Sequence, residues 1–204
     1  MRAIGLVFLA LVVGSEARAQ DSLPAPAWTI DASLWAYIVP ENPDFLSLTV
    51  IADHDWLHLE GRYNYEAIET ASFWVGYDFR VEKKVSLLFT PMAAGLVGSI
   101  DGVAPGYELT LEWWKLEFYS SGEYVIDFDD SSQNFVYNWS QLGIYPLEWL
   151  QFGVVIQRTQ AWESPRDIQR GLFATVGWER FNAGLYVFNP DDTPSWVLSV
   201  GFTY

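Results

Sequence analysis

The only two histidines of the chain, His54 and His58, lie four residues apart, and Asp53 and Asp55 flank the first of them. On a helix this spacing would put both imidazoles on one face, where they could bind a metal ion together with a carboxylate. The surrounding residues indicate a turn followed by the start of a strand, in which four residues span about 13 Å. We therefore predict that both histidines are solvated turn residues and that the chain binds no metal.

The sequence contains no arrangement typical of nucleophilic catalysis. It has no Cys, no G-x-S-x-G motif and no glycine-rich phosphate-binding loop. Pairs of Asp and Glu residues could still do acid–base work. The residues favour a protein that is not an enzyme, and they predict no cofactor.

A second set of ionisable residues lies at alternate positions of expected strands, which would point them to one face. Glu60 and Arg62 belong to one strand and Asp78 and Arg80 to the next, so pairing of the two strands would bring these charges side by side. Charges of both signs on facing walls can bind or steer a polar solute, or they can neutralise one another and fill the interior. Both interpretations stay open. The predicted solute-contacting residues are Glu60, Arg62, Asp78, Arg80, Glu108, Glu112 and Asp127.

The elements that must position these side chains are strands, as the end of the chain illustrates. Large apolar residues occupy every second position there: Trp196, Leu198, Val200, Phe202 and Tyr204. Only a strand places residues with a period of two on one face. Similar alternation recurs from Trp28 onward, separated by turn residues, and predicts an all-β, antiparallel, up-and-down arrangement of twelve strands, with ten as the alternative.

Three places in this pattern are irregular. Pro91 lies within the least polar strand and predicts a bulge or bend, because proline lacks the N–H donor that a ladder needs. Residues 98–106 are rich in Gly and Pro and are expected to form a loop. The alternation slips by one position near Trp113 and Trp114, which predicts a bulge there, and residues 120–122 are expected to form the next turn.

The first nineteen residues have the form of a cleaved secretory signal. Arg2 supplies a short basic region, residues 4–13 are apolar, and Ala17 and Ala19 form an A-x-A cleavage site. The apolar run is shorter than the roughly 20 residues that a membrane-spanning helix requires. We assign residues 1–19 to the signal and residues 20–204 to a single domain.

The composition separates this chain from several classes of protein. Half of its 204 residues are hydrophobic and 17% are aromatic, with eleven Trp and eleven Tyr. Tyr and Trp are enriched at membrane interfaces, where one end of the ring system is wet. The formal net charge of −15 argues against nucleic acid as a partner, because phosphates need a basic surface.

The alternation and the aromatic closing segment resemble those of bacterial outer-membrane β-barrels. The resemblance implies a transmembrane barrel in the bacterial cell outer membrane, in contact with its lipid. It also implies that the barrel assembly machinery recognises the closing segment. The alternative is a soluble periplasmic β-sandwich or lipocalin-like barrel, which would turn its apolar faces inward. Small, neutral residues on the polar faces favour the membrane barrel, because a soluble surface would carry more charge.

Barrels of this size serve as narrow channels, as structural or surface-interaction proteins and as lipid-modifying enzymes, and the fold does not choose among them. We expect a monomer that forms a narrow channel for small polar or charged solutes. A structural barrel with a filled lumen is the alternative, and a lipid-modifying enzyme is the third possibility.

Overall fold

The computed structural model describes residues 27–40, 43–161 and 167–204. The predicted signal at residues 1–19 lies outside this part of the chain. No helix within these ranges is long and apolar enough to cross a membrane. The strands are β1 (Thr29–Ile38), β2 (Phe45–His54), β3 (Leu57–Tyr63), β4 (Thr70–Tyr77), β5 (Phe79–Val81), β6 (Ser86–Gly98), β7 (Gly102–Trp113), β8 (Leu116–Asp127), β9 (Phe135–Leu147), β10 (Leu150–Ala161), β11 (Asp167–Trp178), β12 (Phe181–Phe188) and β13 (Ser195–Thr203).

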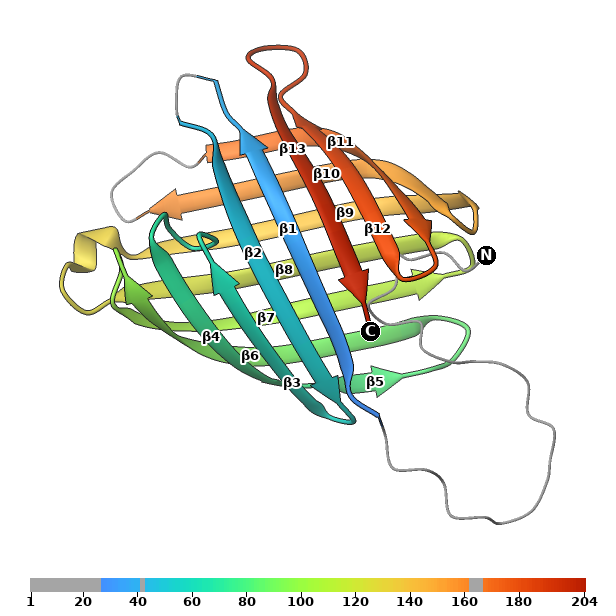
Figure 1. Cartoon of the computed structure of the whole chain (residues 1–204), viewed down its shortest axis with the longest axis horizontal. Helices are drawn as coiled ribbons and strands as arrows, with labels where there is room; N and C mark the ends of the chain where they lie inside the picture. Colours follow the sequence, from blue (N-terminus) through green and yellow to red (C-terminus); the bar gives the residue numbers. More distant parts are fainter. Residues whose placement is uncertain (1–26, 41–42, 162–166) are drawn as a thin grey trace.

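The strands form a closed antiparallel barrel (Figure 1). Strands that follow one another in sequence pair, except that β4 and β5 each pair with β6 and not with one another, and β1 pairs with β13. In the closing pair Leu34 lies opposite Val200, and Ala32 opposite Phe202. The alternating residues at the end of the chain thus belong to the strand that joins the two ends of the sheet. The predicted all-β barrel is confirmed.

The wall of the barrel is twelve strands wide, because β4 and β5 are two parts of one interrupted strand. Gly76 of β4 lies opposite Met92 of β6, and Phe79 of β5 lies opposite Phe89, so no residue is inserted between the two pairings. The interruption falls beside Pro91, which has no N–H to give to the ladder. Pro91 therefore interrupts the hydrogen bonding on one side of β6, and the unshifted register shows that the strand has no bulge there.

The strands β7 and β8 differ from their predicted bounds. The loop between β6 and β7 is only residues 99–101, so most of the Gly- and Pro-rich segment is strand. The slip near Trp113 and Trp114 is the next turn rather than a bulge, because Trp114 has a φ of 56°, in the left-handed region. Residues 120–122, predicted as a turn, lie inside β8. A turn and a bulge both reverse the phase of the pattern, so alternation could not tell them apart.

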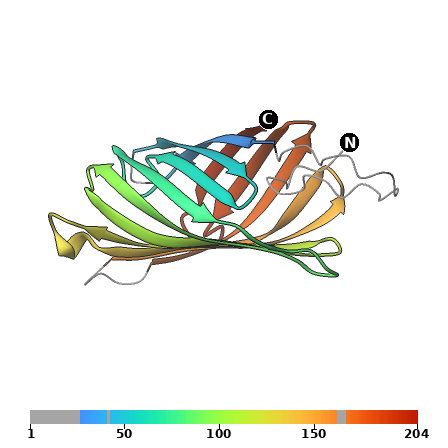
Figure 2. The ribbon, with the colours of Figure 1, turned by 90° about the horizontal axis from the view of Figure 1, so that it is seen from below.

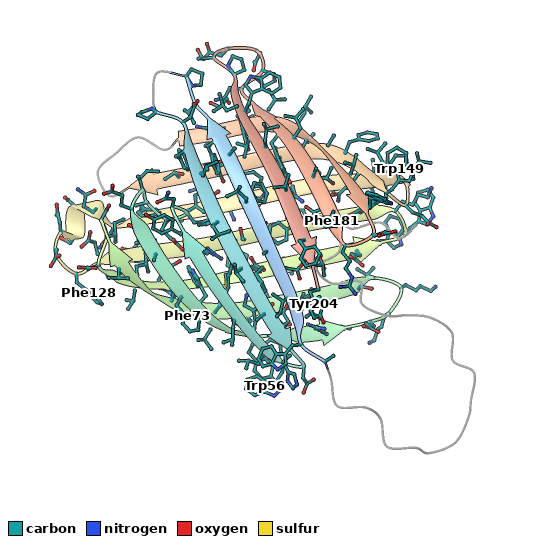
Figure 3. The ribbon with its side chains drawn as sticks, viewed as in Figure 1. Trp56, Phe73, Phe128, Trp149, Phe181 and Tyr204 are labelled. Atoms are coloured by element: carbon teal, nitrogen blue, oxygen red, sulfur yellow. The ribbon has the colours of Figure 1, made fainter. Side chains whose placement is uncertain are left out.

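The two ends of the barrel differ in their connections. At one end, which we name the short-turn end, residues 55–56, 82–85, 114–115, 148–149 and 179–180 join the strands. Exposed tryptophans gather in or beside these turns: Trp56, Trp113, Trp114, Trp149 and Trp178. Figure 3 shows Trp56, Trp149 and Tyr204 toward this end, and Phe128 at the opposite, long-loop end. An aromatic belt of this kind is typical of strand ends that meet a membrane interface.

The apolar faces of the strands point outward. Val200 is 55% exposed and Phe73 58% exposed, although both are mid-strand residues. The closing-strand residues Trp196, Leu198, Phe202 and Tyr204 are exposed as well. A soluble barrel would bury these faces, so the outward arrangement agrees with the membrane interpretation of the pattern.

The interior is flattened and partly filled. The wall that contains β1–β4, β12 and β13 crosses the wall that contains β6–β10 at a steep angle (Figures 1 and 2). One apolar cluster, including Trp74, Met92 and Val125, comes from the β4–β8 side. A second cluster, including Trp139 and Phe173, comes from β9–β13. A cavity lined by ionisable and aromatic residues lies inside the same barrel.

Candidate functional site

The cavity has a volume of about 260 Å³ and is lined by both walls of the barrel. Four of the seven predicted solute-contacting residues line it, Glu60, Arg62, Glu108 and Glu112. Asp31 and Glu117 add carboxyl groups to the lining. The alternation of each strand carries these side chains inward, because the outward positions hold the apolar residues that face away.

Arg62 is the centre of a buried charge network. Its Nη2 donates to Oε2 of Glu60 at 2.8 Å, and its Nη1 donates to Oε2 of Glu123 at 2.9 Å. Oε1 of Glu66 lies 3.6 Å from Nη1. The Arg62 side chain is only 2% exposed. One guanidinium thus faces three carboxylates, which ties β3 to β8 across the lumen.

The turn between β3 and β4 folds inward and completes this network. Glu66 accepts hydrogen bonds from Ser72 Oγ at 2.7 Å and from Trp74 Nε1 at 3.1 Å. The guanidinium carbon of Arg62 lies 4.4 Å from the ring centroid of Tyr65 and 4.5 Å from that of Trp74. An arginine between two aromatic faces gains cation–π attraction. The turn therefore packs into the lumen instead of standing in solvent.

His58 corrects one of the sequence predictions. It is fully buried, and its Nδ1 lies 2.8 Å from Oδ1 of Asp53, so it is not a solvated turn residue. Its Nε2 lies 3.7 Å from Oε2 of Glu60, which connects it to the Arg62 network. His54 instead lies against the ring of Trp28, with centroids 4.9 Å apart. The two imidazoles lie on different faces, and no metal-binding group is found among the described residues.

The prediction that Asp78 and Arg80 lie beside Glu60 and Arg62 is wrong. In the register of β3 with β4, Glu60 lies opposite Trp74 and Arg62 opposite Ser72. Asp78 is buried near the short-turn end, where it accepts a hydrogen bond from Thr90 Oγ1 at 2.6 Å. Arg80 is exposed and donates to Asp78 at 2.6 Å. Neither residue lines the cavity.

Asp127 also has a structural position rather than the predicted one in the lumen. Its Oδ1 accepts the backbone N–H groups of Asp129 and Asp130, at 2.8 and 3.2 Å, and so shapes the loop after β8. Asp130 in turn caps the short 3₁₀ turn of Ser131–Gln133. Hydrogen bonds from Ser132 lower the pKa of Asp130, because they stabilise its charged form. Asp127 and Asp130 thus use their carboxyl groups to fold this loop.

Glu112 and Glu117 form the other acidic part of the cavity. They lie directly opposite each other on β7 and β8, next to the turn at Trp114. Glu117 accepts hydrogen bonds from Gln151 Nε2 at 2.9 Å and from Tyr145 Oη at 3.1 Å. Like charges directly opposite in a sheet destabilise it. This pair is therefore a feature that folding alone does not favour.

Three tyrosines lie between two cavities of the lumen. A second cavity of about 170 Å³ lies toward the long-loop end, and Tyr37, Tyr65 and Tyr137 line both cavities. The rings of Tyr65 and Tyr137 meet edge to face, with centroids 5.7 Å apart. We name these three residues the tyrosine constriction. They separate the acidic cavity from the outer one.

Sequence reasoning misplaced the partners of Arg62 and missed Glu66 and Tyr65. The correct position of the turn after β3 would have given the strand register around Arg62. With residues 64–69 as the turn, simple counting sets Arg62 against residue 72 and not against Asp78. No comparable signal exists for Glu66 and Tyr65, which lie in the turn itself. A period-two pattern says nothing about a side chain outside the strands.

Comparison with known proteins supports the fold. No protein-family model matches the sequence, and no curated protein is similar to it. Among solved structures, the KdgM porin is similar with a TM-score of 0.60 at 11% identity, covering 86% of this chain and 99% of that one. The outer membrane protein Omp33 of Acinetobacter baumannii gives 0.52 at 9% identity, covering 88% and 98%. The NanC porin gives 0.51 at 11% identity, covering 86% and 99%. The chain thus has the fold of outer-membrane β-barrel porins.

Proposed function

We propose that this barrel lies in the bacterial outer membrane and conducts small polar or charged solutes. The observation that carries the proposal is the cavity of about 260 Å³, lined by ionisable and aromatic residues, within a barrel whose outer face is apolar. The similar KdgM and NanC structures are named as porins, and one KdgM structure is a complex with disordered oligogalacturonate. These neighbours favour a channel over a lipid-modifying enzyme.

Outer-membrane lipid and the barrel assembly machinery are the partners that this proposal requires. The belt of exposed tryptophans supports the first, because Trp prefers the membrane interface. The closing pair of β1 with β13 supports the second, because it places Phe202 and Tyr204 at the short-turn end of the seam. Fractionation of the native envelope tests the location: the protein should sediment with the outer membrane, and recovery in the soluble periplasmic fraction would contradict it.

A barrel with a filled lumen is the second candidate function. The Arg62 network and the two apolar clusters occupy much of the interior, as a structural barrel would require. The two candidates differ in whether a path passes the tyrosine constriction.

Single-channel recording in a planar bilayer separates these candidates. We expect discrete, small conductance steps from the purified barrel, with folding verified by heat-modifiable gel migration. Tyr65→Ala and Tyr137→Ala should each raise the conductance by about twofold or more, because each removes a ring from the narrowest part of the path.

Tyr63→Ala is the matched control for this experiment. Tyr63 lies two residues before Tyr65 but faces outward, with 47% of its surface exposed. Its replacement should leave the conductance unchanged. Absence of steps from the folded protein and from both constriction variants would reject the channel and favour the filled barrel.

A further inference from the structure

We infer that the acidic cavity is a binding site for small organic cations, such as compounds with an ammonium or guanidinium group. This inference rests on the proposed channel and names the class of solute that the channel would admit. It starts from the carboxyl groups of the cavity that no basic side chain neutralises.

Arg62, which lines the cavity, and the adjacent His58 are already bound to carboxylates. Arg62 pairs with Glu60, Glu66 and Glu123, and His58 is bound to Asp53. Within the described ranges no ion pair involves the other cavity carboxyl groups, those of Asp31, Glu108, Glu112 and Glu117. Asp31, Glu108 and Glu117 are buried and accept hydrogen bonds but have no counter-charge within ion-pair distance among the residues described. Buried charge without a counter-charge is costly, so these groups would gain from a cation that enters the cavity.

Asp31 supplies an oxygen that is free to bind such a cation. The residue is 7% exposed and lines the cavity. Its Oδ1 accepts a hydrogen bond from Thr203 at 2.5 Å, whereas its Oδ2 is buried and has no hydrogen-bond partner in the described part of the chain. Buried carboxylate oxygens are normally paired. An unsatisfied carboxylate oxygen on a residue that lines a cavity indicates a position where a donor from outside the protein could bind after a small side-chain rotation.

Glu112 and Glu117 provide a second position at the same end of the cavity. Their direct opposition on β7 and β8 brings two carboxyl groups to one face of the sheet. A cation between them would convert an unfavourable pair into a favourable one. The arrangement therefore selects for positive charge, and a solute anion would meet further repulsion.

The remaining wall fits the apolar part of an organic cation. Trp35, Trp139 and Tyr186 pack against one another, with centroid separations of 6.0, 5.4 and 5.3 Å, and all three line the cavity. Aromatic faces attract ammonium and guanidinium groups and also pack against methylene groups. A cavity of about 260 Å³ suits a small solute rather than a large one.

Two measurements with matched probes test this inference. Reversal potentials in a KCl gradient should show that K⁺ carries most of the current. Isothermal titration of the folded barrel should show binding of 1,4-diaminobutane, and neither 1,4-butanediol nor succinate should bind. These three compounds share a four-carbon chain and differ in charge, so they isolate the role of the positive groups.

Asp31→Asn and the double variant Glu112→Gln/Glu117→Gln should each weaken diamine binding by at least about tenfold, because each removes charged hydrogen-bond acceptors. The double variant should also lower the preference for K⁺. Glu148→Gln is the control: it removes one charge from an exposed turn at the same end of the barrel, and it should change neither result.

The outcomes distinguish the inference from the proposed function. An open channel that prefers Cl⁻, or a barrel that binds succinate as well as the diamine, would overturn the cation site and leave the channel intact. A silent barrel that binds the diamine through Asp31 would support the site and reject the channel. Equal diamine binding by the wild type and all variants would overturn the site.

Discussion

Replacing Arg62 with methionine is expected to lower the free energy of unfolding by about 3–5 kcal/mol. The substitution removes the one guanidinium that Glu60, Glu66 and Glu123 share. It leaves their carboxyl groups buried without a counter-charge, and desolvation then opposes folding. Urea unfolding of the barrel in lipid vesicles, followed by tryptophan fluorescence, measures the change.

Arg180→Met is the control for this substitution. Arg180 lies in an exposed turn, with its guanidinium carbon 5.1 Å from the ring centroid of Tyr204, so its loss should cost about 0.5–1 kcal/mol. Adding Glu60→Gln to Arg62→Met should recover part of the lost stability, because it removes one of the unpaired charges. An Arg62→Met effect no larger than that of the control would mean that the network does not hold β3 to β8.

Replacing Val200 with arginine is expected to destabilise the barrel by about 2–4 kcal/mol. Val200 is 55% exposed in the middle of β13 and lies opposite Leu34 in the closing pair. If this face meets the bilayer midplane, the guanidinium must enter hydrocarbon or distort the lipid around it. The same unfolding measurement in vesicles gives the difference between variant and wild type.

Ile38→Arg compares the same change at a different depth. Ile38 also faces outward but is the last residue of β1, so the cost there should fall to about 0–1 kcal/mol. Equal and small effects at both positions would contradict a lipid-facing surface and favour a soluble barrel. Equal and large effects would mean that Ile38 also lies within the hydrocarbon region.

Four of the predicted solute-contacting residues line the cavity, and the others show where sequence reasoning fails. Glu60, Arg62, Glu108 and Glu112 share the inward phase of their strands. Arg80 continues the inward phase of its strand, yet it is exposed in the short β5 beyond the interruption at Pro91. Alternation is a local rule, and it holds only while the ladder on both sides is intact.

The charge network itself could not be predicted from spacing. Arg62 meets Glu123, which lies 61 positions further along the chain and on a different part of the barrel wall. Such contacts depend on strand register and on the curvature that brings opposite walls together. Register in turn depends on the placement of each turn, and one misplaced turn at Trp114 displaced the expected bounds of two strands.

The sequence by itself determined which side chains of most strands share the apolar face and which share the polar face, and it predicted that the final strand closes the barrel. The reason is that a period of two follows from the geometry of a single strand and needs no knowledge of its neighbours. Only the tertiary structure decided that Glu66 and Tyr65 fold into the lumen and that Arg62 serves three carboxylates. It also left Asp31, Glu112 and Glu117 without a basic partner among the described residues, because which groups meet across a lumen depends on register, turns and flattening together.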